Sequence, residues 1–180
     1  MVKVIAFDLV GVLVRERDVE LNQDESQIEK LFGPNLSDEE FISELVPFDK
    51  KYIADTTKTI INKLYEVKDR ELIDKLRLKY PDVKLVIATN HVSYIRKYID
   101  DNFRVDKVFI SAEMHKIKSN SDFYNTIAKD LNCKNNEILF IDDNADYVSI
   151  ARESGMKSFK MDKTKILYDQ IVNYFSLLTK

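Results

Sequence analysis

The sequence predicts a three-layer α/β protein, in which a mostly parallel sheet lies between two layers of helices. Three observations support this prediction. After Pro81, short apolar runs alternate with amphipathic helical patterns, as is typical of a parallel sheet with crossover helices. The run from Val2 to Phe7 has the same apolar, partly β-branched character, which indicates a first buried strand. Between these two parts, from Glu16 to about Lys79, the pattern is helical, which predicts a small helical insertion.

The helical insertion contains one clear start signal. Ser37 followed by Glu40 has the pattern of a capping box, and it predicts a helix that ends before Pro47. Further apolar residues at helical spacing run through Tyr52–Leu64 and through Leu72–Leu78. We therefore expect a cap built from helices alone.

The part after Pro81 supplies the remaining strands and helices. The strands are expected at 84–88, 107–110, 138–141 and 157–159, and the helices at 92–99, 122–131, 145–154 and 164–178. Gly155 follows the third of these helices, as is common at helix C-termini. The predicted domains are a core of residues 1–15 and 80–180 and a helical cap of residues 16–79.

Composition excludes several classes of function. The 180 residues are 44% apolar and 33% charged, and 28 basic residues stand against 31 acidic ones, so we expect neither nucleic acid nor membrane as a partner. No segment approaches the roughly 20 apolar residues of a membrane span, and the first residues lack signal-peptide features. A single cysteine, Cys133, permits no internal disulfide and no cysteine cluster for zinc. We expect a cytoplasmic monomer or homodimer.

Polar side chains gather where the predicted strands end. They are Asp8 after the first strand, Thr89 and Asn90 after the second, and Asp142 and Asp143 after the fourth. The carboxyl ends of parallel strands share one edge of a sheet, where ligands of open α/β folds bind. Lys118 adds a cation on a nearby loop. Carboxylates with a lysine form an oxygen-rich site that suits Mg²⁺.

Each of these residues, taken alone, also has a purely structural interpretation. An aspartate, threonine or asparagine after a strand often caps the next helix or turn, and an isolated lysine is usually solvated. His91 adjoins the predicted site, and contact with the substrate is the less favoured of its interpretations; His115 is interpreted as a loop residue. The functional interpretation depends on the residues coming together.

The order of these residues resembles the four signature motifs of the haloacid dehalogenase superfamily, which is dominated by phosphatases. The matching segments are Phe7–Leu13, Ile87–Asn90, Ser111–Tyr124 with its Lys118, and Phe140–Asn144 continued by Ala151–Met156. The resemblance spans nearly the whole chain. It implies a Rossmann-like core with an inserted cap that covers the site and selects small soluble substrates.

The resemblance also implies a role for each site residue. Asp8 is expected to attack phosphorus and form an aspartyl phosphate, while Thr89, Asn90 and Lys118 bind the phosphoryl group and offset its charge. Mg²⁺ is expected between Asp8, the backbone carbonyl of Val10 and Asp143, with Asp142 bound directly or through water. The expected partner is a small-molecule phosphate monoester, with sugar phosphates as one class.

Val10 departs from the family pattern in a way that bears on activity. Most family phosphatases carry a second aspartate there, which protonates the leaving oxygen and activates water. General acid–base catalysis typically contributes about 10²- to 10⁴-fold in rate. A competing interpretation is therefore a catalytically weak or inactive member that binds Mg²⁺ and a phosphorylated ligand. Smaller departures are Ser119 in place of a proline and His115 in place of a glycine.

Two more classes of protein share part of this residue pattern. A haloacid dehalogenase needs no such acid, although dehalogenases lack the adjacent pair Asp142–Asp143. A phosphorylated signalling receiver also combines carboxylates, threonine and lysine on a parallel sheet. Receivers, however, place the acidic pair early in the chain, whereas here it comes after the threonine and the lysine.

Overall fold

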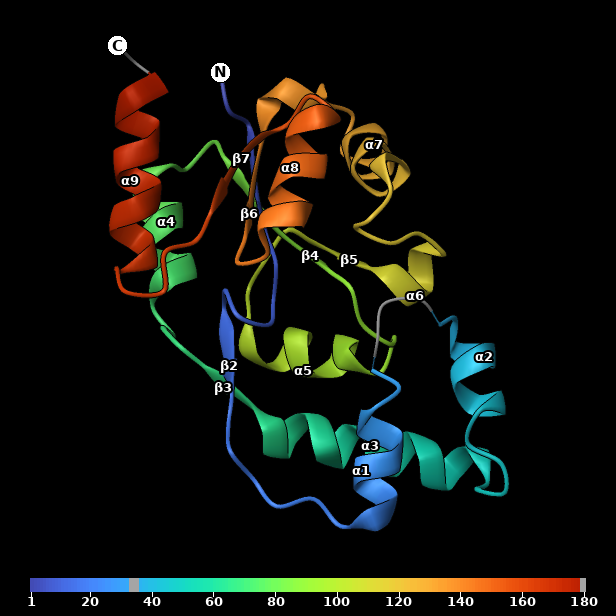
Figure 1. The fold of residues 1–180 in the computed structure, drawn as a ribbon. Helices are drawn as coiled ribbons and strands as arrows, with labels where there is room; N and C mark the ends of the chain where they lie inside the picture. The colour runs from blue at the N-terminus through green and yellow to red at the C-terminus, as the bar shows by residue number, and fades with distance from the viewer. Residues whose placement is uncertain (33–35, 179–180) are drawn as a thin grey trace.

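A five-stranded parallel sheet with helices on both faces forms the centre of the molecule (Figure 1). The computed structural model describes residues 1–32 and 36–178. The strand order is β5-β4-β1-β6-β7, and each neighbouring pair is parallel. The strands are β1 (Val4–Phe7), β4 (Lys84–Thr89), β5 (Lys107–Ile110), β6 (Ile138–Asp142) and β7 (Lys157–Lys160). The three-layer α/β fold expected from the sequence is confirmed.

Alternate residues of each strand lie on opposite faces of the sheet, because successive side chains point in opposite directions. In β1, Val4 and Ala6 pack with the helices of one face, and Ile5 and Phe7 with those of the other. The first face is covered by α7 (Ser121–Asp130) and α8 (Ala145–Glu153), and the second by α4 (Leu72–Lys79), α5 (Ile95–Asn102) and α9 (Leu167–Leu178).

A second, two-stranded antiparallel sheet lies between the main sheet and the inserted helices (Figure 1). It pairs β2 (Val14–Glu16) with β3 (Tyr65–Val67), so the expectation that residues 16–79 are entirely helical is wrong at Glu16 and at Tyr65–Val67. Three-residue strands that pair across about fifty residues of chain carry too short a pattern to be recognised in sequence. The inserted helices are α1 (Gln23–Glu29), α2 (Asp38–Ser43) and α3 (Lys50–Leu64).

Several element boundaries also differ from the prediction. Helix α5 begins at Ile95 instead of Val92, and α9 at Leu167 instead of Thr164, because Thr164 donates its backbone N–H to Asp162 in a turn. The short helices α6 (Ser111–Met114) and η1 (Asn135–Glu137) were not expected. Helix α4 ends beside α9, where the Tyr80 and Phe175 rings stack with centroids 4.4 Å apart. The division of the chain at residues 16 and 79 stays a prediction.

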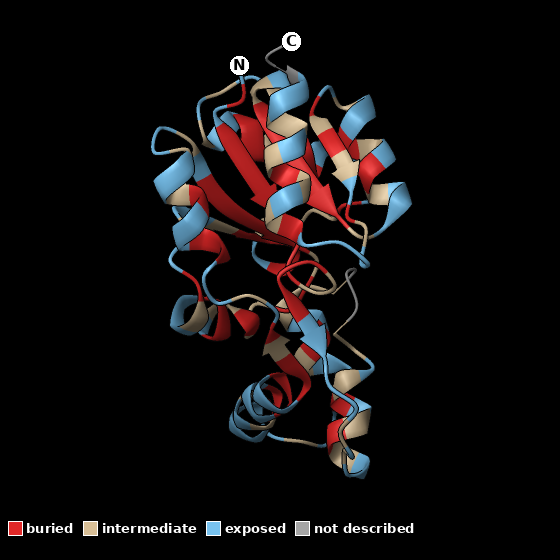
Figure 2. Ribbon diagram, turned by 90° about the vertical axis from the view of Figure 1, so that its left-hand side faces the viewer, coloured by how far each residue is buried: buried red, intermediate tan, exposed pale blue. Residues whose placement is uncertain are grey.

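Helices α1 to α3 share one hydrophobic cluster with the main sheet. Figure 2 marks the buried residues of the sheet and of the inserted helices in red. The predicted capping box of Ser37 and Glu40 is present at the start of α2. The same helix is tied to the core by Asp38, whose carboxylate accepts hydrogen bonds from the backbone N–H and the hydroxyl of Ser93. Helix α2 is thus tied to the segment that follows β4, while α3 packs against α5. No helix in residues 1–32 or 36–178 is long and apolar enough to cross a membrane.

Candidate active site

The three central strands bring the predicted site residues to one edge of the sheet. Asp8 directly follows β1, Thr89 ends β4, and Asp142 ends β6, and β1 lies between the other two strands. The backbone N–H of Asp8 donates to the carbonyl of Ile141 over 2.8 Å, so the two strand ends stay in register. Parallel pairing therefore places these side chains together although they are far apart in sequence.

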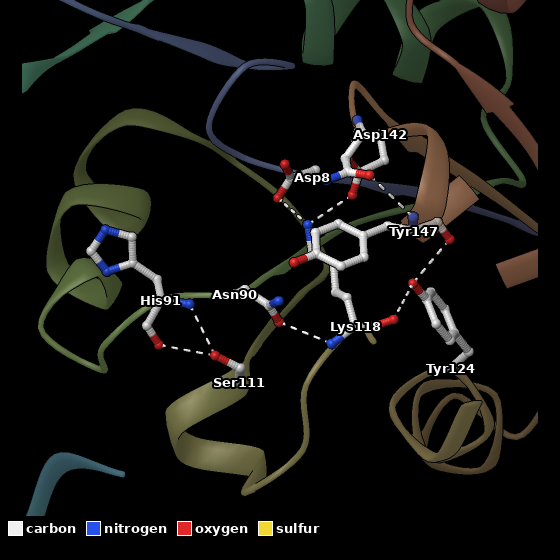
Figure 3. Close-up of polar contacts among 9 residues, drawn as sticks. Asp8, Asn90, His91, Ser111, Lys118, Tyr124, Asp142 and Tyr147 are labelled. Atoms are coloured by element: carbon white, nitrogen blue, oxygen red, sulfur yellow. Dashed lines mark hydrogen bonds and ion pairs between the residues drawn. The ribbon is translucent and has the colours of Figure 1, made fainter. Parts of the chain in front are cut away.

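Lys118 joins two of the carboxylates through its ammonium group. Its Nζ lies 2.5 Å from Asp8 Oδ1 and 2.8 Å from Asp142 Oδ2 (Figure 3). The lysine is only 1% exposed, which rules out the interpretation of a solvated surface residue. Burial by itself lowers the pKa of Lys118, but the carboxylates of Asp8 and Asp142 outweigh burial and raise that pKa above its usual value. The ammonium stays charged and fixes the orientation of the Asp8 carboxylate.

The backbone of Lys118 is held on both sides by side chains of the site. Its N–H donates to Asn90 Oδ1 over 3.1 Å, and its carbonyl accepts a hydrogen bond of 2.9 Å from the Tyr124 hydroxyl. That hydroxyl also bonds to the carbonyl of Tyr147, as Figure 3 shows. Sequence reasoning placed Tyr124 in a motif but missed this positioning contact. The side-chain N–H₂ of Asn90 is buried and makes no hydrogen bond to any residue that the structure describes.

Three carboxylates form a compact cluster of oxygen donors. One oxygen each from Asp8, Asp142 and Asp143 lies within 4.8 Å of the others. Burial raises the pKa of Asp142 to about 6. The nearby Asp8 carboxylate also raises this pKa, whereas the Lys118 ammonium lowers it. Asp143 is more open, and its Oδ2 lies 2.7 Å from the exposed ammonium of Lys163. Oxygen donors at this spacing fit the ligand preference of Mg²⁺.

The loop after β1 approaches the cluster through its backbone. Gly11 has a φ of +86°, and a Cβ at this position would lie 2.3 Å from Asp143 Oδ2, so only glycine leaves room for that carboxylate. In the same turn the carbonyls of Leu9 and Val14 accept hydrogen bonds. Among the residues described, none donates to the carbonyl of Val10, which leaves that oxygen available as a ligand. Sequence reasoning missed the contact of Gly11 with Asp143.

The two histidines lie outside the carboxylate cluster. His91 is 2% exposed, its Nε2 lies 3.0 Å from the Tyr65 hydroxyl, and its ring packs on Phe32. Burial lowers the pKa of His91 to about 4, so the ring is neutral at pH 7. His115 is exposed at the end of α6 with a left-handed backbone. His91 thus contributes to packing, and the position of His115 agrees with its interpretation as a loop residue.

Comparisons of sequence give limited information about this chain. No family model matches it. A drimenol cyclase of Aspergillus calidoustus, drtB, is 33% identical over 76 residues, which are 42% of this chain. The match spans 14% of the length of that curated protein.

Comparisons of structure cover nearly the whole chain. A structure named as a predicted HAD-like family hydrolase, from Porphyromonas gingivalis, has a TM-score of 0.71 at 23% identity and covers 97% of this chain and 98% of its own. A HAD family enzyme of Bacteroides thetaiotaomicron, in complex with magnesium and inorganic phosphate, has a TM-score of 0.70 at 16% identity and covers 94% and 99%. An L-2-haloacid dehalogenase of Xanthobacter autotrophicus with covalently bound chloropropionic acid has a TM-score of 0.59 at 15% identity and covers 91% and 80%.

The chain has the haloacid dehalogenase fold. The resemblance drawn from the four motifs is thereby confirmed for the fold, which the chain shares with these hydrolases. One edge of the sheet carries all the residues singled out from the sequence: Asp8, Val10, Thr89, Asn90, Lys118, Asp142 and Asp143. Their chemical roles stay predictions.

Proposed function

We propose that the protein is a Mg²⁺-dependent hydrolase of small-molecule phosphate monoesters that forms an aspartyl phosphate on Asp8. One observation carries the proposal: Lys118 lies between Asp8 and Asp142, and Asp143 completes a carboxylate cluster beside them. Phosphoryl transfer depends on positioning and on stabilisation of charge, and a buried lysine among oxygen donors supplies both. When bound, Mg²⁺ offsets the negative charge of the phosphoryl group. Asp8, Asp143, the Val10 carbonyl and Asp142 would hold it.

The carboxylate of Asp8 performs the first step. The ion pair with Lys118 holds this carboxylate in one orientation, and the buried Asn90 N–H₂ is a free donor for an oxygen of the phosphoryl group. An oxygen of Asp8 bonds to phosphorus while the bond from phosphorus to the ester oxygen breaks. Water then cleaves the aspartyl phosphate and releases inorganic phosphate and Asp8.

Val10 limits both half-reactions, because a valine can neither protonate the leaving oxygen nor activate water. The side chain is half-buried and packs against the hydrophobic cluster. Alkyl phosphates, whose leaving oxygen needs a proton, are expected to react slowly. Aryl and acyl phosphates have better leaving groups and are expected to react faster in the first step.

A screen of phosphorylated metabolites with Mg²⁺ tests the proposal, with released phosphate and phosphorylation of Asp8 both measured. The Asp8→Asn variant is the control for phosphorylation at that residue. Val10→Asp is expected to raise turnover of alkyl phosphates by about 10² to 10⁴. Phosphorylation of a residue other than Asp8, or no phosphorylation and no release from any ester by the protein and by Val10→Asp, would contradict the proposal.

Val10 also supports a second candidate, a protein that binds Mg²⁺ and a phosphorylated ligand without turning it over. Binding of a phosphorylated metabolite in calorimetry, together with no turnover by Val10→Asp, would favour this role. A dehalogenase would release halide from a short 2-haloacid without added Mg²⁺. Such release at useful rates would replace both candidates.

A further inference from the structure

A polar cavity of about 400 Å³ lies away from the carboxylate cluster, beside the strands β2 and β3. These strands belong to the two chain connections between the main sheet and helices α1 to α3. The cavity is lined by residues of several chain segments. Its lining residues include Arg17, Arg70, Glu66, Tyr98 and Asn62. A molecule bound here would contact both connections and helix α5 together.

The cavity carries an excess of positive charge. Its cationic groups are Arg17, just after β2, and Arg70, shortly after β3. Neither guanidinium has a carboxylate within 4.0 Å among the residues that the structure describes. The carboxylate that also lines the cavity, Glu66, is already paired with Arg15 over 2.9 Å. Two guanidinium charges therefore remain unbalanced by any close carboxylate of the described chain.

The cavity also contains a tyrosine hydroxyl that lacks a partner. Tyr98 is 7% exposed, and its hydroxyl makes no hydrogen bond with any residue in the described part of the chain. Burial raises the pKa of this hydroxyl, while the charges of Arg17 and Arg70 lower it, so both cations act on the same oxygen. The hydroxyl is protonated at neutral pH and is a free donor. Arg17 already donates to the carbonyl of Asn62, which restricts its side chain.

We propose that this cavity is a binding site for a small-molecule phosphate dianion, separate from the candidate active site. Arginine forks bind phosphate oxygens by charge-assisted hydrogen bonds, and a doubly charged phosphate balances two guanidinium groups where a carboxylate balances one. The Tyr98 hydroxyl supplies a further donor. The ligand joins Arg17, Arg70 and helix α5, and so restricts movement of the inserted helices relative to the sheet.

The consequence concerns access to the candidate active site. Asp8 is 7% exposed and Thr89 is 1% exposed, and on this proposal the inserted helices move to admit a substrate. A phosphate held at the two connections slows that movement. None of the residues of this cavity belongs to the carboxylate cluster. Phosphate binding in the cavity can therefore be tested independently of the proposed hydrolysis.

Titration with inorganic phosphate, followed by NMR without added Mg²⁺, tests the site residue by residue. Saturable shifts are expected at the side-chain Nε–H groups of Arg17 and Arg70 and at the Tyr98 ring. Arg70→Gln is expected to weaken this binding at least about tenfold, since it removes a charge-assisted donor. Acetate, which carries a single charge, is expected to bind more weakly than phosphate.

The matched control is Arg104→Gln, which removes the same charge from an exposed position outside the cavity. This variant is expected to bind phosphate like the parent protein. Shifts confined to Thr89 and Asn90 would overturn the proposal, as would equal weakening by Arg104→Gln and Arg70→Gln. In either case the proposed hydrolase function would be unaffected, because its assay measures phosphorylation of Asp8.

Discussion

Replacing Gly11 by alanine is expected to displace the Asp143 carboxylate and to weaken Mg²⁺ binding. A Cβ at Gly11 would lie 2.3 Å from Asp143 Oδ2 and 2.6 Å from its Cγ, far inside van der Waals contact. The carboxylate would have to move by more than about 1 Å, which takes it out of its place beside Asp8 and Asp142. Changes that misplace metal ligands typically reduce affinity about 10- to 100-fold.

The same substitution also strains the backbone, and a second glycine separates the two effects. Gly11 and Gly155 both have a positive φ, +86° and +94°, and alanine at such a position costs roughly 1–2 kcal/mol. At Gly155, however, the nearest atom to a Cβ is Asn135 Cβ at 3.5 Å, which is an ordinary contact. Gly155→Ala is therefore expected to lose stability but to keep its affinity for Mg²⁺.

Isothermal titration calorimetry with Mg²⁺ and urea unfolding measure the two quantities separately. Both variants are expected to unfold more easily than the parent protein, and Gly11→Ala by at least as much as Gly155→Ala, because its Cβ also displaces a carboxylate. If Gly11→Ala bound Mg²⁺ as tightly as Gly155→Ala, then the position of Asp143 would not matter for the metal. The assignment of Asp143 as a ligand would then be refuted.

Three further outcomes are expected. Thr57→Val should raise the free energy of unfolding by about 1–2 kcal/mol in urea titrations, because the buried Thr57 hydroxyl has no partner among the described residues. The control Thr59→Val, at an exposed position, should not raise this free energy. Burial lowers the pKa of His91 to about 4, so the unfolded state binds the proton first and stability falls from about pH 6.5 to pH 4. Unfolding of His91→Gln at pH 7 and pH 5 should show a smaller loss. Lys163→Met should raise the affinity for Mg²⁺ several-fold in calorimetry, because it removes the cation that is paired with the Asp143 carboxylate. The control Lys160→Met should change this affinity less.

The three central strands of the main sheet, β1, β4 and β6, were predictable because each contains a continuous apolar run that is buried on both faces. Residues 138–141, for example, are completely buried, and the sequence there is entirely apolar. In β2 and β3 the pattern is only three residues long, and Arg15 and Glu66 face solvent opposite each other. Short strands of this kind are defined by their distant partner, which a local pattern cannot reveal.

The candidate site was predictable where strand topology alone brings residues together. Asp8, Thr89 and Asp142 come together because their strands are neighbours, and the alternation of strands and helices predicts such a sheet edge. Contacts that depend on backbone conformation were not predictable. The approach of Gly11 to Asp143 depends on a positive φ, which the sequence allows but does not require.

The inserted helices leave the sheet and return to it at neighbouring points. The backbone N–H of Arg17 donates to the carbonyl of Leu64 over 2.7 Å, so residues 18–63 form an excursion whose two ends are joined. A segment of another length or sequence can be connected at the same two residues without a change in strand order. An engineer who matches the apolar residues that α1 to α3 contribute to the shared hydrophobic cluster can therefore exchange this segment without altering the strands that carry the carboxylate cluster.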